Sequence, residues 1–200
     1  MMNKTIVKSV ALASAVVLAT GMAHAQEYKV GIVTFLSGAA SGPFGIPAKN
    51  AADLIIDALN SGTLPGPFAG TGMDGRDIVP IYVDEAGGAT KQIAEFRNLS
   101  ERDRVDSVVG YISSGNCLAI PSVAEELETL TVLFDCGTPR VFEEASYKYV
   151  FRTQSTATMD NVAAAYYVNE LLPDLKSVSG INQNYAWGHD SWRDFIATLN

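Results

Sequence analysis

The chain has 200 residues, 48% of them hydrophobic, which is enough for one domain with a real core. Its 14 basic and 22 acidic residues give a formal net charge of −8. An acidic chain has no general field that attracts nucleic acid or anionic lipid, so we exclude both as partners. The same field does not attract an anionic solute, and any bound anion needs local hydrogen-bond donors.

The N-terminus has the pattern of a secretory signal peptide. Lys4 and Lys8 give it a positive start. Residues 6–22 are almost wholly apolar or small apart from Lys8, and the Ala-His-Ala that ends at Ala25 supplies the small residues of a cleavage site. A membrane anchor is the weaker alternative, because the uncharged run is shorter than the roughly 20 residues a span needs. We predict that residues 1–25 are removed by cleavage after Ala25, which leaves 12 basic and 22 acidic residues and a net charge of −10.

Two cysteines, Cys117 and Cys136, remain in the exported chain. An even number of cysteines in an oxidising compartment favours a disulfide between them. The alternative is a pair of buried free thiols, since cysteine is often buried as a small apolar residue.

Short β-rich runs alternate with helical patterns along residues 26–153. We predict strands at 28–35, 78–84, 107–112, 131–134 and 149–153, and helices at 48–60, 89–101 and 119–130. Pro80 places the second strand toward a sheet edge, because proline cannot donate to a ladder. This alternation is typical of βαβ units, so the predicted fold class is α/β, a parallel sheet flanked by helices.

Residues 154–200 are interpreted as the incomplete beginning of a second α/β lobe. They contain a predicted helix at 159–172, a strand at 177–182 and a helix at 191–199. The segment 152–155, where the chain leaves the first lobe, is the expected hinge.

The loops that follow the strands are rich in Gly, Ser and Thr, and ligands of open parallel sheets bind beyond the carboxyl ends of the strands. Ser113, Ser114, Gly115 and Asn116 precede a helix, whose free N–H groups suit a carboxylate. Ordinary capping by Ser114 or Asn116 is the alternative, and both roles can hold together. Trp187 can cover an apolar or aromatic solute, or it can pack between helix and sheet.

Four stretches carry a resemblance to a known family: SGPFGIPAKNAADLIIDALN, DGRDIVPIYVDEAGG, VVGYISSGNCLAIPSVAEEL with LFDCGTP, and YVFRT with NYAWG. Their order and spacing over residues 27–200 resemble the leucine/isoleucine/valine-binding branch of the type I periplasmic binding proteins. The resemblance implies two lobes around a cleft, a periplasmic location, and delivery of a bound solute to an ABC permease in the inner membrane.

The resemblance also implies ligand-binding residues. In the family, a Ser-rich turn binds the solute's carboxylate, and Ser113, Ser114 and Gly115 match that turn. Thr138 matches a ligand-binding threonine of the next loop, and Phe44 and Trp187 match the aromatic residues of the site. The acidic residue that binds an α-ammonium group in relatives lies beyond residue 200. The expected solute is a branched-chain amino acid, an amide or an aromatic acid.

We expect a monomer without a cofactor or metal, and not an enzyme. His189 is the only histidine after residue 25, and the chain has no nucleophile elbow, Walker loop or metal-ligand cluster. Arg140 is expected to form a surface salt bridge with Glu143 or Glu144. The alternative function is a receptor-type module that senses a solute with the same fold.

Overall fold

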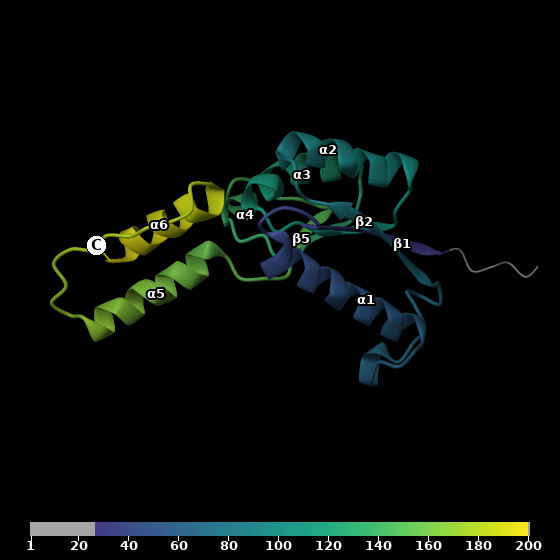
Figure 1. Ribbon diagram of the computed structural model, residues 1–200, viewed down its shortest axis with the longest axis horizontal. Helices are drawn as coiled ribbons and strands as arrows, with labels where there is room; N and C mark the ends of the chain where they lie inside the picture. The colour runs from purple at the N-terminus through teal and green to yellow at the C-terminus, as the bar shows by residue number, and fades with distance from the viewer. Residues whose placement is uncertain (1–26, 200) are drawn as a thin grey trace, which may run out of the picture.

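The computed structural model describes residues 27–199, so the predicted signal peptide lies outside the described residues (Figure 1). Five parallel strands form one sheet in the order β2-β1-β3-β4-β5. Their bounds are β1 Tyr28–Thr34, β2 Ile78–Asp84, β3 Ser107–Gly110, β4 Thr131–Leu133 and β5 Val150–Arg152. The predicted α/β class with a parallel sheet is confirmed.

Strand β2 lies at one edge of the sheet and pairs with β1, where Pro80 sits opposite Val30. An edge strand leaves one row of backbone groups unpaired, so a residue without an N–H is tolerated there. The edge position predicted from Pro80 is therefore confirmed.

Helices cover both faces of the sheet. The bounds are α1 Ile46–Asn60, α2 Gly88–Arg97, α3 Ser114–Glu126, α4 Arg140–Glu143, α5 Ala157–Leu171 and α6 Ala186–Leu199, with short helical turns η1 Ser41–Gly45, η2 Gly66–Phe68 and η3 Asn98–Arg102. Figure 1 shows α1 on one face and α2 with α3 on the other. Strands joined by crossover helices of this kind need both faces covered, which explains their nearly continuous apolar runs.

The core is divided by the sheet into two parts, as the alternation of side chains along β1 shows. Val33 packs with Phe96 and Leu99 beneath α2 and α3. Val30 and Ile32 point to the other face, where they pack in a smaller cluster that includes residues of α1. Each such side chain stabilises the fold by roughly 1.5–3 kcal/mol when it is fully buried.

Helices α5 and α6 form a packed pair that extends beyond the end of the sheet (Figure 1). The predicted strand at 177–182 is wrong: these residues are exposed coil, and Ile181 is fully exposed. A strand needs a neighbour for its backbone hydrogen bonds, and none lies beside this segment among the described residues. None of the helices in residues 27–199 is long and apolar enough to cross a membrane.

Both helices of this pair begin earlier than predicted. α5 starts at Ala157, because the side chain of Thr156 accepts a hydrogen bond of 3.3 Å from the N–H of Met159 and so caps the first turn. α6 starts at Ala186 rather than at residue 191, which places Trp187 in the first turn of this helix.

Candidate ligand-binding site

A cavity of about 550 Å³ lies at the carboxyl ends of the strands, on the side of α5 and α6. The residues that line it follow β1, β3, β4 and β5 or come from the segments at the start of η1, α5 and α6: Phe35, Ala39, Ala40, Phe44, Ile112, Ser113, Asp135, Gly137, Gln154, Ser155, Asp160, Gln183, Tyr185 and Trp187. The expected position beyond the strand ends is therefore the position of this cavity.

The turn after β3 supplies Ser113 to the cavity. Ser114 begins α3 and is buried, and its hydroxyl has no hydrogen-bond partner among the described residues. Gly115 is exposed on the first helical turn. The first N–H groups of a helix lack acceptors within the helix, so this turn keeps donors for a ligand. The side chain of Ser113, the N-cap residue of α3, makes no capping hydrogen bond among the described residues.

Glu85 holds this turn in place from the end of β2. Its Oε2 accepts a hydrogen bond from the N–H of Ile112 at 2.8 Å, and its Oε1 accepts from the N–H of Ser113 at 2.7 Å and from Asn116 Nδ2 at 3.1 Å. Burial raises the pKa of this carboxyl. Nothing in the sequence indicates these contacts, because they join Glu85 to residues 27 and 28 positions away.

Asp84 fixes the first loop in the same way. Its carboxylate accepts hydrogen bonds from the N–H groups of Leu36 at 2.9 Å and Ala86 at 3.1 Å and from the hydroxyl of Ser37 at 2.5 Å. Burial alone would raise the pKa of Asp84, but these hydrogen bonds outweigh it and lower the pKa. The loop that carries Phe44 is thus anchored to the sheet at its start.

Both expected aromatic residues line the cavity. Phe44 is 52% exposed on η1, and Trp187 is half-buried at the start of α6. A Cβ added at Gly137 would lie 2.5 Å from Cδ1 of Trp187, so the indole rests directly on the backbone of the loop after β4. Gly137 is required for this close approach.

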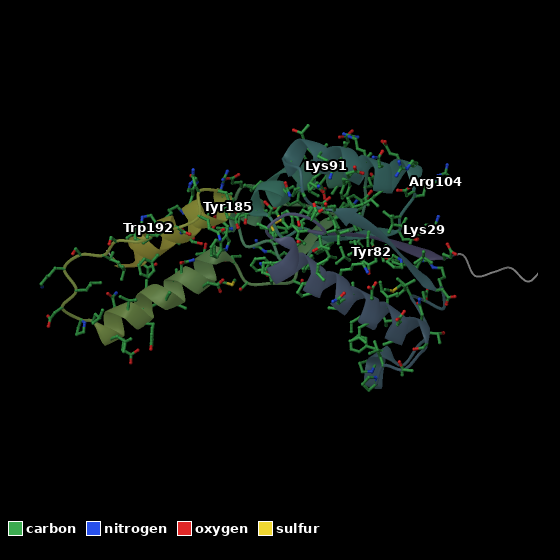
Figure 2. The ribbon with its side chains drawn as sticks, viewed as in Figure 1. Lys29, Tyr82, Lys91, Arg104, Tyr185 and Trp192 are labelled. Carbon is green, nitrogen blue, oxygen red and sulfur yellow. A yellow bond between two sulfur atoms is a disulfide. The ribbon has the colours of Figure 1, made fainter. Side chains whose placement is uncertain are left out.

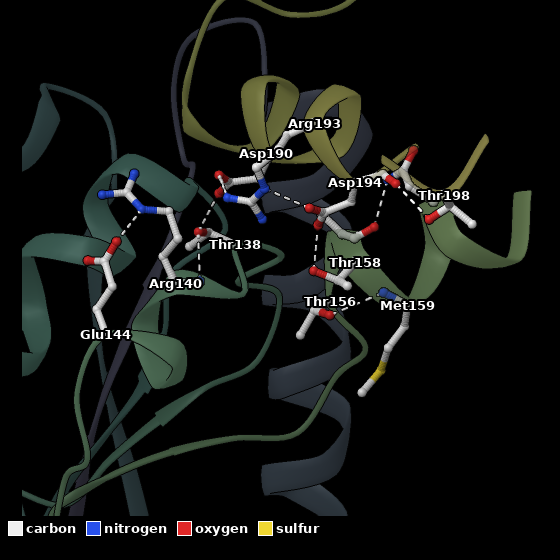
Figure 3. A network of polar contacts seen from close by, with 12 residues as sticks. Thr138, Arg140, Glu144, Thr156, Thr158, Met159, Asp190, Arg193, Asp194 and Thr198 are labelled. Atoms are coloured by element: carbon white, nitrogen blue, oxygen red, sulfur yellow. Dashed lines mark hydrogen bonds and ion pairs between the residues drawn. The ribbon is translucent and has the colours of Figure 1, made fainter. Parts of the chain in front are cut away.

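Thr138 lies behind the cavity and not in its lining. It is fully buried, and its hydroxyl donates a hydrogen bond of 2.7 Å to Oδ2 of Asp190 on α6. Arg193 contacts the other oxygen of Asp190 at 3.1 Å and Asp194 at 2.6 Å, and Thr158 of α5 donates to Asp194 at 2.6 Å. Figure 3 shows this network, which ties the loop after β4 to α5 and α6.

A profile of the periplasmic binding protein family matches residues 27–200. The chain belongs to this family. A search of curated proteins found no match.

Solved structures share the fold of this periplasmic binding protein at low identity. A solute-binding protein of an ABC transporter from R. palustris, in complex with 4-hydroxybenzoate, is 22% identical with a TM-score of 0.70. The match covers 87% of this chain and 44% of that protein. The Desulfitobacterium hafniense substrate-binding protein in complex with Leu is 15% identical with a TM-score of 0.69 and coverages of 87% and 47%. LivJ of Streptococcus pneumoniae in complex with isoleucine is 20% identical with a TM-score of 0.66 and coverages of 84% and 46%. The chain therefore spans less than half the length of these proteins.

The predicted disulfide is present in this periplasmic binding protein. Cys117 on the first turn of α3 is bonded to Cys136 in the loop after β4, with 6.1 Å between the Cα atoms. Both residues are fully buried, and the neighbours of Cys136, Asp135 and Gly137, line the cavity. The bridge thus joins the first turn of α3 to the loop after β4 beside the cavity.

Asp135 and Tyr185 also line this cavity. Burial raises the pKa of both groups. Tyr185 lies just before α6, at the end of the α5–α6 pair that is nearer the sheet (Figure 2). The amide nitrogen of Gln154 donates to Oδ1 of Asp135 at 2.6 Å when the amide is oriented to satisfy its neighbours.

The other expected residues have structural contacts. The side chain of Arg140 pairs with Glu144 at 2.6 Å, which confirms the predicted surface salt bridge. His189 lies in α6, with Nε2 2.9 Å from Oδ1 of Asn184. Because both cysteines are in the disulfide, neither forms a Cys–His nucleophile pair.

Proposed function

We propose that this chain is the solute-binding component of an ABC importer, exported by a signal peptide that is cleaved after Ala25 and active in the periplasm. The observation that carries the proposal is the cavity of about 550 Å³ at the carboxyl ends of four strands, faced by the start of α6. A site between a sheet edge and a second structural unit suits a protein that closes over a small molecule. The partner that receives the solute would be a permease of the inner membrane.

The proposed solute is a small amino-acid-like or carboxylate-bearing molecule: a branched-chain amino acid, an amide or an aromatic acid. The hydroxyl of Ser113 and the first-turn donors of Ser114 and Gly115 would receive a carboxylate. Phe44 and Trp187 would cover the carbon skeleton. The complexes of family neighbours with 4-hydroxybenzoate, Leu and isoleucine support this range of solutes.

We further propose that residues 154–200 begin a second lobe and that the protein belongs to the leucine/isoleucine/valine-binding branch. The segment 152–155 would act as the hinge. The hydrogen bond from Thr138 to Asp190 would then stabilise the closed state, because the two residues lie on opposite sides of that hinge in the sequence. A solute that binds the closed state more tightly shifts the population toward it.

The test is a ligand screen on the full-length protein purified without bound solute from the periplasm. Amino acids, amides and aromatic acids are added singly, and thermal unfolding and small-angle scattering are measured with each. We expect at least one solute to raise the melting temperature and to reduce the radius of gyration. A panel that leaves both quantities unchanged would contradict solute capture by closure.

A further inference from the structure

The charged side chains that line the cavity are all acidic. They are Asp135 and Asp160, and no Lys, Arg or His belongs to the lining among the described residues. The two arginines nearest in sequence to this wall already have hydrogen-bond or ion-pair partners. Arg140 pairs with Glu144, and Arg152 donates to the carbonyl oxygen atoms of Cys136 and Thr138. The wall formed by the first lobe therefore offers a solute negative charge.

Two backbone donors that could otherwise bind an anion on this wall are occupied. The N–H groups of Ile112 and Ser113 donate to the carboxylate of Glu85 at 2.8 and 2.7 Å. A carboxylate of the protein thus fills the place that an anionic solute could take at the end of β3. A solute carboxylate must bind farther along, on the first turn of α3.

Asp135 is held in a fixed orientation with one oxygen free. Its Oδ1 receives the amide nitrogen of Gln154 at 2.6 Å, and the amide oxygen of Gln154 accepts from the N–H groups of Cys136 at 3.2 Å and Gly137 at 3.3 Å. The disulfide of Cys136 adds a covalent restraint next to this loop. Oδ2 of Asp135 has no hydrogen-bond partner among the described residues, and the side chain is half-buried in the cavity lining.

We propose that Asp135 binds a nitrogen-bearing group of the solute, an amine or an amide N–H, through its free Oδ2. This inference rests on the proposed function and narrows the solute class to molecules that carry such a nitrogen. The solute's apolar body lies between Phe44 and Trp187, and any carboxylate lies at the first turn of α3. A simple carboxylic acid is disfavoured, because it would dehydrate Oδ2 of Asp135 without giving this oxygen a hydrogen-bond donor.

The test compares matched pairs of solutes that differ only in the amine. L-leucine is compared with 4-methylpentanoate, and L-phenylalanine with 3-phenylpropanoate, by calorimetric titration of the full-length protein and of Asp135→Asn. The substitution keeps the size of the side chain and its contact with Gln154 but removes the charge. Asp74→Asn is the control, since Asp74 is exposed, lies far from the strand ends that form the cavity, and has a φ of 55° that asparagine also adopts.

We expect the amines to bind more tightly than their deaminated partners, and Asp135→Asn to weaken amine binding by a factor of about 10 to 100, as for one charge-assisted hydrogen bond. Asp74→Asn should change the affinity less than about twofold, the effect usual for a remote surface charge. Circular dichroism of Asp135→Asn should match that of the wild type.

Tighter binding of the deaminated acids, with affinity equal or higher in Asp135→Asn, would overturn the inference and leave solute capture intact. If neither pair binds and the wider screen produces no compaction, the proposed function itself fails and this inference fails with it.

Discussion

Oγ1 of Thr138 donates a hydrogen bond of 2.7 Å to Oδ2 of Asp190, although the two residues are 52 positions apart. Both side chains are buried, and Arg193 occupies the other oxygen of Asp190 at 3.1 Å. This hydrogen bond joins the loop after β4 to α6. Thr138, which the sequence predicts as a ligand contact, therefore has a role in holding two parts of the chain together.

The first prediction separates these two roles of Thr138. Thr138→Val keeps the shape of the side chain but leaves a buried oxygen of Asp190 without its donor. Such a loss costs about 1–3 kcal/mol. We expect the free energy of unfolding, measured by urea denaturation, to fall by about 2 kcal/mol.

The control is Thr71→Val, at an exposed threonine, which should change stability by less than about 0.5 kcal/mol. If Thr138 instead contacts the solute, Thr138→Val will keep the wild-type stability and lose ligand affinity. That pattern would contradict the structural role.

Much of the sheet and its covering helices could be predicted from the sequence. The strands of a covered parallel sheet are nearly continuous apolar runs, such as residues 30–33 of β1, and glycine-rich loops mark their ends. The predicted strand at 177–182 failed because local composition does not show whether a pairing partner is present. The early start of α6 was missed because the aromatic residue and glycine of NYAWG, Trp187 and Gly188, are ordinary loop signals, yet here they belong to the helix.

The candidate site was also predictable in part, because its residues follow the ends of strands that the sequence locates. Ser113, Phe44 and Trp187 line the cavity as expected, while Ser114, Gly115 and Thr138 do not belong to its lining, and contact with a solute stays a prediction for all six. The roles of Glu85 and Asp135 were missed. Their partners are distant in sequence or come from another loop, and only the folded arrangement of the strand ends brings these groups together.

The second prediction concerns the pH dependence that Glu85 imposes on stability. Burial raises the pKa of this carboxyl above its ordinary value of 4.5, so the folded state holds a proton that the unfolded state has already lost. The contribution of Glu85 to stability is therefore complete at acid pH and falls as the pH rises through this window. Glu85→Gln removes the titration.

Urea denaturation of the wild type and Glu85→Gln between pH 4 and pH 7 measures this effect. Because the distant acidic groups titrate in the same way in both proteins, the difference in unfolding free energy reports residue 85 together with its electrostatic coupling to Asp135. We expect the stability advantage of the wild type to shrink as the pH rises. An advantage that grows with pH would mean that the three hydrogen bonds to Glu85 outweigh its burial.

The third prediction concerns the bond between Cys117 and Cys136, which are 19 positions apart. Closing a loop of this length restricts the unfolded chain and stabilises the fold by about 3 kcal/mol in the chain-entropy model. The double variant Cys117→Ala with Cys136→Ala should lose about that amount in chemical denaturation. Wild-type protein treated with a reductant should unfold at the same denaturant concentration as the variant, while the reductant should not change the variant. A reductant effect on the variant would point to another cause.

The fourth prediction tests the contact between Gly137 and Trp187. Gly137→Ala places a methyl carbon 2.5 Å from Cδ1 of the indole, so the ring must move away from the loop after β4. We expect solute affinity to fall at least tenfold, and the fluorescence of Trp187, measured in a Trp192→Phe background, to shift as the ring changes its exposure. Gly70→Ala is the matched control, because its Cβ would meet nothing within 4 Å. If Gly137→Ala alters neither the affinity nor the emission, the indole does not rest on this loop in solution, and Trp187 cannot be the cover of the site.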